Sequence, residues 1–191
     1  FGLKEFGNIY SRLGNPTVGA LEARLTALEE GAMCVALSSG TSAVMYSLIN
    51  IMSQGDNFVT ANQLYGGTYT MFDNILPEYG IDSKKVDITD LKAVEDAIDD
   101  KTRAVYCETI TNPGLVVADI SALADIAHSK GIPLIVDATF TTSAILKPFE
   151  YGADIVVYSL TKWMSGHGRV IAGAVIEKGG FDWGNGNFPL Y

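Results

Sequence analysis

The feature that most constrains this chain is a pair of apolar, strand-like runs that each lead into a charged residue. Residues 154–158 (DIVVY) lead into residues 159–162 (SLTK), and residues 132–136 (IPLIV) lead into Asp137. Continuous apolar runs of this length, rich in β-branched residues, predict buried strands. A lysine and an aspartate beside buried strands are costly to desolvate unless each has a partner. A ligand bound between the two strand ends would supply both partners.

Strand-like and helix-like patterns alternate along the chain. Apolar strand-like runs lie at residues 34–37, 58–61, 103–109, 132–136, 154–158 and 170–176, and residues 84–87 (KKVD) end another strand. Stripes of apolar residues at helical spacing lie between them, and Leu21, Leu25 and Leu28 form one such stripe. We expect Gly31 to end that helix. The alternation predicts an α/β fold of three layers (αβα), in which helices cover both faces of a mainly parallel, seven-stranded sheet.

Ligands of such sheets bind beyond the carboxyl ends of the strands. The polar clusters of this chain fall there, because residues 38–42, 108–112 and 159–162 and Asp137 each follow an apolar strand. One ligand suits both Lys162 and Asp137, namely pyridoxal phosphate. A lysine amine condenses with its aldehyde, and an aspartate keeps its ring nitrogen protonated. Once released, the lysine amine can move protons between substrate and cofactor.

Two further stretches suit the phosphate group of that cofactor. Ser159 and Thr161 lie two residues apart, so in an extended segment their hydroxyls would share one face and could bind the phosphate together. Gly40 and Thr41 lie at an expected helix start, where unpaired backbone N–H groups and the helix dipole favour an anion.

Residues 159–162 (SLTK), with residues 136–140 (VDATF) upstream, resemble the fold-type I pyridoxal-phosphate enzymes of cysteine and methionine metabolism. Within that family the chain is most similar to the O-acetylhomoserine sulfhydrylases, on residues 1–10 (FGLKEFGNIY), 65–69 (YGGTY), 166–168 (GHG) and 181–189 (FDWGNGNFP). The resemblance implies that residues 1–191 are the large, cofactor-binding domain with part of an N-terminal arm. It also implies that the C-terminal substrate domain of the family is absent from this chain.

The resemblance implies a role for several residues. Lys162 would hold the cofactor covalently, and Asp137 would pair with its ring nitrogen. Tyr65 would stack on the cofactor and assist departure of the substrate's γ-group, and Asn112 would contact the ring hydroxyl. Ala138 departs from the family pattern, because asparagine often stands there, and this puts a polar contact beside Asp137 in doubt.

Tyr10 and Arg12, in residues 10–16 (YSRLGNP), resemble phosphate ligands that a neighbouring subunit supplies in this family. An arginine fork suits a phosphate because it donates two parallel hydrogen bonds. The resemblance thus implies a homo-oligomer, at least a dimer with shared sites and by expectation a tetramer.

The implied reaction is a γ-replacement in methionine biosynthesis, in which O-acetylhomoserine and sulfide, or another sulfur donor, give homocysteine and acetate. Methionine γ-lyase and cystathionine γ-synthase or γ-lyase are the alternatives within the family. Gly67 favours the sulfhydrylase, whereas Arg169 departs from its pattern and residues 170–173 (VIAG) are closer to the lyases. A non-enzyme alternative is an inactive fragment that acts only in cofactor binding or assembly, because the arginine that binds the substrate carboxylate lies in the C-terminal domain of the family.

Charge and composition argue against other classes of protein. Asp and Glu number 22 against 13 Lys and Arg, and the net charge of −9 disfavours nucleic acid and anionic membranes as partners. No apolar run approaches the roughly 20 residues of a membrane span. Cys34 and Cys107 lie in apolar runs and are predicted to be buried free thiols, as suits a cytoplasmic protein. These cysteines and the two histidines do not form a metal-binding pattern.

Overall fold

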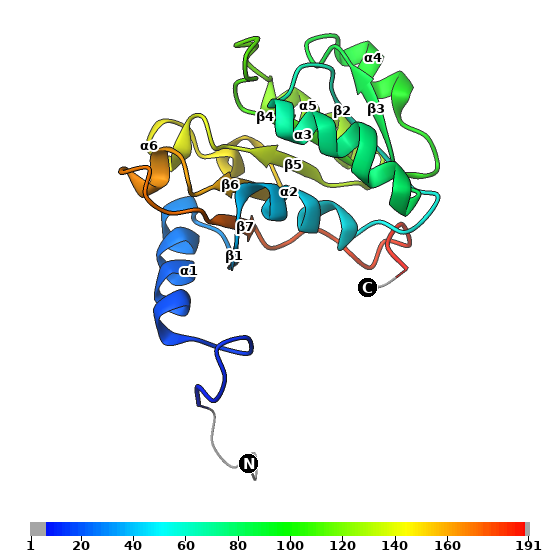
Figure 1. The fold of residues 1–191 in the computed structure, drawn as a ribbon. Coiled ribbons are helices and arrows are strands. Elements are labelled where there is room, and N and C mark those ends of the chain that lie inside the picture. The colour runs from blue at the N-terminus through cyan, green and yellow to red at the C-terminus, as the bar shows by residue number, and fades with distance from the viewer. Residues whose placement is uncertain (1–6, 190–191) are drawn as a thin grey trace.

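Seven short segments of residues 7–189, the part of the chain that the computed structural model describes, pair into one sheet (Figure 1). The strands are β1 (Met33–Leu37), β2 (Asn57–Ala61), β3 (Asp82–Val86), β4 (Thr102–Glu108), β5 (Leu134–Asp137), β6 (Ile155–Ser159) and β7 (Gly173–Glu177). Their order across the sheet is β1-β7-β6-β5-β4-β2-β3. The predicted three-layer α/β fold with seven strands is confirmed.

Strand β7 is the exception to the parallel arrangement. Strands β2 to β6 pair in parallel, whereas β7 runs antiparallel to both of its neighbours, β1 and β6. The strand begins at Gly173, three residues later than the apolar run from residue 170 predicted. All five residues of β2 are buried, as expected for a strand covered on both faces.

Six α-helices connect or cover these strands in the described part of the chain. They are α1 (Pro16–Glu29), α2 (Gly40–Ile49), α3 (Gly66–Thr70), α4 (Leu91–Ala97), α5 (Ile120–Ser129) and α6 (Thr142–Ile145). A π-helix (Met71–Ile75) and a 3₁₀-helix (Leu76–Tyr79) continue α3, and further 3₁₀ turns lie at Pro148–Tyr151 and Trp163–Ser165. No helix among residues 7–189 is both long enough and apolar enough to span a membrane.

Helix α1 shows how local sequence sets an element's ends. The Asn15 side chain accepts hydrogen bonds from the backbone N–H groups of Thr17 and Val18 and so caps the first turn. The helix ends at Glu29, and Glu30 rather than Gly31 takes the left-handed conformation, with φ 59°. Gly31 is needed instead for packing, because a Cβ there would lie 2.7 Å from Ile176 Cγ2.

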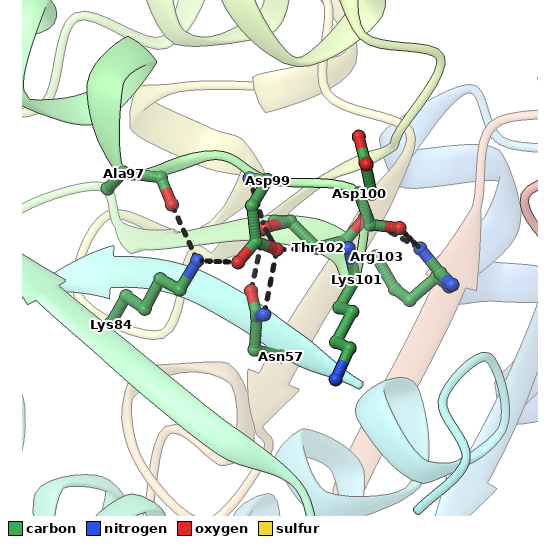
Figure 2. Close-up of polar contacts among 8 residues, drawn as sticks. All are labelled: Asn57, Lys84, Ala97, Asp99, Asp100, Lys101, Thr102 and Arg103. Atoms are coloured by element: carbon green, nitrogen blue, oxygen red, sulfur yellow. Dashed lines mark hydrogen bonds and ion pairs between the residues drawn. The ribbon is translucent and has the colours of Figure 1, made fainter. Parts of the chain in front are cut away.

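A polar network ties β2, β3 and β4 together near the amino ends of β2 and β4 (Figure 2). The Asp99 carboxylate accepts hydrogen bonds from Asn57 Nδ2 at 2.9 Å, Lys84 Nζ at 2.6 Å and the Lys101 N–H at 2.9 Å. The hydrogen bond from Lys84 is the main reason that the pKa of Asp99 lies well below its usual range. Thr102 Oγ1 lies 2.7 Å from Asn57 Oδ1 and joins the network to β4. This network lies at the opposite edge of the sheet from the polar clusters, which follow the carboxyl ends of the strands.

Candidate active site

A cavity of about 690 Å³ lies at the carboxyl edge of the sheet, which is a volume suited to a small molecule. The ends of β4, β5 and β6 and the starts of α2 and α3 line it. Eight of the predicted site residues meet there: Gly40, Thr41, Tyr65, Asn112, Asp137, Ser159, Thr161 and Lys162. The structure therefore brings together residues that span more than 120 positions of the sequence, since 162 − 40 = 122.

The start of α2 presents hydrogen-bond donors to this cavity. The Ser39 side chain caps the helix by accepting from the Ser42 N–H at 3.0 Å, and the Ser39 carbonyl accepts from the Ala43 N–H. The N–H groups of Gly40 and Thr41 have no acceptor within the described residues. Two unpaired donors at the positive end of a ten-residue helix form a site suited to an anion.

Two glycines allow α2 to begin so close to the sheet. A Cβ on Gly40 would lie 2.4 Å from Ser159 Cβ. A Cβ on Gly173 would lie 2.0 Å from the carbonyl oxygen of Ser39. Real Cβ atoms essentially never approach another heavy atom closer than 3.0 Å, so any side chain at either position would fill the space that the helix start occupies.

Asp137, the last residue of β5, presents its carboxylate to the cavity with acceptor capacity to spare. Its Oδ1 accepts from the Thr139 N–H at 2.9 Å, and Tyr106 Oη donates to Oδ2 over 3.4 Å. Burial raises the pKa of Asp137, and the hydrogen bonds from Thr139 and Tyr106 oppose that rise. Burial also raises the pKa of Tyr106, so that side chain remains a donor. A cation beside Asp137 would favour the ionised carboxylate.

The segment after β6 corrects one prediction. Ser159 ends the strand, and Thr161 and Lys162 lie in a turn. The prediction that an extended segment places the hydroxyls of Ser159 and Thr161 on one face is therefore wrong. The physical reason is a pairing with Ala172, whose N–H donates to Thr161 Oγ1 at 3.1 Å and whose carbonyl accepts from it at 3.3 Å. The Lys162 N–H donates to the Ser159 carbonyl at 3.2 Å, whereas the Lys162 side chain makes no hydrogen bond or ion pair within the described residues.

Glu108, the last residue of β4, belongs to the cavity lining, as its place in the polar cluster 108–112 predicts, although the sequence assigned it no role of its own. Its carboxylate accepts from the Tyr65 N–H at 2.7 Å and from the Asn112 N–H at 3.1 Å. Burial, together with the nearby Asp137 carboxylate, raises the pKa of Glu108 to about 7. The signal that could have found it is a second carboxylate at the end of a buried strand, in register with Asp137 on β5.

The structure does not bring Tyr10 and Arg12 to the cavity. Both precede α1, at the end of that helix remote from the sheet (Figure 1), and the Arg12 guanidinium lies 4.8 Å from the centroid of the Tyr10 ring. Their supply to the site of another subunit stays a prediction. Of the stretch 1–10 that carried part of the resemblance, residues 1–6 lie outside the described residues.

The stretch 181–189 also lies away from the cavity lining. Phe181, Trp183 and Phe188 pack against one another with ring centroids 4.6–5.8 Å apart. Asn185 and Asn187 donate to the carbonyl of Gly131, which attaches this stretch to the end of α5. Residues 7–189 contain no group of three or more His, Cys, Asp or Glu that could hold a metal ion, and Cys34 and Cys107 are buried and free, as predicted.

The seven-stranded sheet, with its cavity at the carboxyl edge, has the architecture of the fold-type I α/β class. The sequence profile of the Cys/Met metabolism PLP-dependent enzymes matches residues 1–189, and the chain belongs to that family. It is 47% identical, over all of its 191 residues, to the O-acetyl-L-homoserine sulfhydrylase of Leptospira meyeri. It spans 43% of the length of that relative.

Two solved structures agree with this family assignment. One is a putative O-acetylhomoserine (thiol)-lyase from Campylobacter jejuni that contains N'-pyridoxyl-lysine-5'-monophosphate. It has a TM-score of 0.88 and 43% identity, and the match covers 92% of this chain and 43% of that one. The other is a cystathionine gamma-lyase from Lactobacillus plantarum in complex with L-serine. It has a TM-score of 0.86 and 40% identity, and the match covers 94% of this chain and 48% of that one.

Proposed function

We propose that this chain is the pyridoxal-phosphate-binding large domain of an O-acetylhomoserine sulfhydrylase. The observation that carries the proposal is that Lys162, Asp137 and the unpaired N–H groups of Gly40 and Thr41 line one cavity. These groups fit the cofactor, because its aldehyde needs an amine, its ring nitrogen a carboxylate and its phosphate a set of donors. Gly40 and Gly173, which leave room at the start of α2, keep the N–H donors for the phosphate accessible.

When bound, the cofactor supplies an aldehyde that takes up an amine and a protonated ring that accepts an electron pair. Lys162 would hold it, and the released Nζ would take the α-proton of the substrate. Asp137 would hold the proton on the ring nitrogen, and the Ser159 and Thr161 hydroxyls would border the phosphate. Tyr65 would lie against the ring and donate to the departing γ-group, and Asn112 would meet the ring hydroxyl.

The reaction proposed for the whole protein joins O-acetylhomoserine and a sulfur donor to give homocysteine and acetate, in methionine biosynthesis. The name of the Leptospira meyeri relative supports this choice. The similarity to a cystathionine gamma-lyase keeps a lyase as the second candidate, because both reactions need the same lysine and the same electron acceptor. We further propose that Tyr10 and Arg12 act in the site of a second subunit of a homotetramer, and that the protein is cytoplasmic.

The cofactor assignment is tested by borohydride reduction of the full-length protein, followed by peptide mapping. The expected result is a pyridoxyl group on Lys162, and a Lys162→Ala variant that retains no label. Lys178 is a suitable control, because it contacts the carbonyl of Phe149 and is not part of the cavity lining. A label on Lys178, or on any lysine other than Lys162, would contradict the assignment.

The reaction is tested by product analysis. The full-length protein is given O-acetylhomoserine with and without sulfide, and methionine separately, and homocysteine and 2-oxobutyrate are quantified. Homocysteine should dominate in the presence of sulfide. A barrier difference of about 1.4 kcal/mol changes the product ratio tenfold, so the ratio is a sensitive measure. Abundant 2-oxobutyrate from methionine, with little homocysteine, would assign the protein to the lyases instead.

A further inference from the structure

We propose that Glu108 is a positioning residue: its buried carboxylate joins two separate loops and so sets where Tyr65 and Asn112 lie in the cavity. Glu108 is 5% exposed, and each of its carboxylate oxygens accepts one backbone N–H. The roles of Tyr65 and Asn112 rest on the proposed function, whereas the clamp itself rests on the contacts alone.

The two loops come from different parts of the sequence. Tyr65 immediately precedes α3, and its N–H lies 43 positions from Glu108, whereas Asn112 lies only four positions from it. No side chain caps the start of α3. The loops also touch, since a Cβ on Gly114 would lie 1.6 Å from Gln63 Oε1. The carboxylate at the end of β4 is thus an acceptor that the two loops share.

The clamp depends on the charge of Glu108. An ionised carboxylate accepts through both oxygens, whereas a protonated carboxyl turns one of its oxygens into a donor and can no longer satisfy both N–H groups equally well. The titratable groups that interact electrostatically with Glu108 are Asp137 on β5 and Tyr106 and Cys107 on β4, and the titratable side chains of Tyr65 and Lys162 line the same cavity. Because the pKa of Glu108 is raised to about 7, the clamp should weaken as the pH falls through neutrality.

The test is hydrogen exchange at the backbone amides of Tyr65 and Asn112, measured by residue-resolved mass spectrometry on the full-length protein between pH 5 and 9. Protection is expressed relative to the intrinsic exchange rate at each pH. Loss of a hydrogen bond to a charged acceptor is expected to lower protection on the order of ten- to a hundredfold at one or both amides. Wild-type protection should therefore fall with a midpoint near pH 7 in the cofactor-free protein.

Glu108→Gln should show low protection at one or both amides and no pH dependence there. Glu29→Gln is the matched control, because Glu29 is also buried but lies at the end of α1, where its carboxylate accepts from Tyr158 Oη of β6. Wild-type protection that stays flat from pH 5 to 9, or a Glu108→Gln protein with unchanged protection at both amides, would overturn the clamp. The wild-type pH profile decides the matter even where the variant does not fold.

Cofactor binding separates this inference from the proposed function. A protonated ring nitrogen beside Asp137 would offset the repulsion between the two carboxylates, so the midpoint in pyridoxal-phosphate-loaded protein should lie at lower pH than in cofactor-free protein. A pH-dependent clamp whose midpoint does not move on loading supports the role of Glu108 and counts against the pairing of Asp137 with the ring nitrogen.

Discussion

Replacing Gly173 by alanine should destabilise the protein by displacing the start of α2. The new Cβ would lie 2.0 Å from the Ser39 carbonyl oxygen, 2.5 Å from its carbon and 2.9 Å from Gly40 N. All three atoms belong to the backbone, and β7 is held between β1 and β6, so neither side moves easily. The Ser39 carbonyl would have to retreat by about 1 Å, and it also accepts the Ala43 N–H of the first helical turn.

The expected cost is about 3 kcal/mol, the upper part of the usual range for overpacking, because no flexible side chain can absorb the clash. With a urea dependence of about 2 kcal/mol per molar, the unfolding midpoint should fall by roughly 1.5 M. Far-UV circular dichroism at fixed protein concentration measures this midpoint.

Gly19→Ala is the matched control for Gly173→Ala. Gly19 lies inside α1, and a Cβ there meets nothing within 4 Å. The alanine should therefore leave the midpoint unchanged or raise it by up to roughly 0.5 M, which corresponds to the gain in helix propensity of about 1 kcal/mol. A Gly173→Ala midpoint within about 0.3 M of the wild type would refute the reasoning, because it would correspond to a cost below about 0.6 kcal/mol.

Three further predictions concern other parts of the molecule. Asp99→Ala should lower the free energy of unfolding by about 2 kcal/mol, because the hydrogen bonds that Asn57, Lys84 and Lys101 donate to the carboxylate are lost. Asp96→Ala, whose ion pair with a lysine is exposed, should cost less than about 0.5 kcal/mol. Urea unfolding at pH 7 compares the two. Mixing inactive Arg12→Ala and Lys162→Ala subunits of the full-length protein should restore activity in hybrid sites, and no recovery despite proven subunit exchange would count against a shared site. The free energy of unfolding of the wild type, relative to that of Glu108→Gln, should fall by about 3 kcal/mol as the pH rises from 4.5 to 7. The reason is that the folded state holds the Glu108 proton more tightly than the unfolded state does. A difference that is independent of pH in cofactor-free protein would contradict this.

Much of the fold follows from local pattern, because apolar periodicity marks each strand and helix. Apolar periodicity does not encode strand direction, and nothing in the apolar run of β7 distinguishes it from the strands β2 to β6, which pair in parallel. The leucine stripe of α1 shows a second limit. Leu25 is buried, but Leu21 and Leu28 remain 41% and 37% exposed, because a stripe predicts an apolar face without saying what covers that face.

The candidate site also has residues that the local sequence pattern predicts and others that it does not. Lys162 and Asp137 were found because a charge that follows a buried strand is unusual in itself. The turn at Thr161 was missed because its cause is a hydrogen-bond pair with Ala172, eleven residues later in the chain. Glu108 was missed as a clamp because one of its partners, the Tyr65 N–H, lies 43 residues earlier.

The pairing of β1 with β7, a strand far along the chain, has a consequence for synthesis of the protein. Within the described residues, the edge strand β1 pairs only with β7, with Leu37 opposite Gly173 and Met33 opposite Glu177. These contacts span roughly 140 residues, which take roughly 7 to 28 s to translate. During that interval β1 has left the ribosome without its partner strand, and its backbone donors and acceptors remain open to other chains. The nascent protein must therefore keep β1 from pairing with other chains until β7 has emerged.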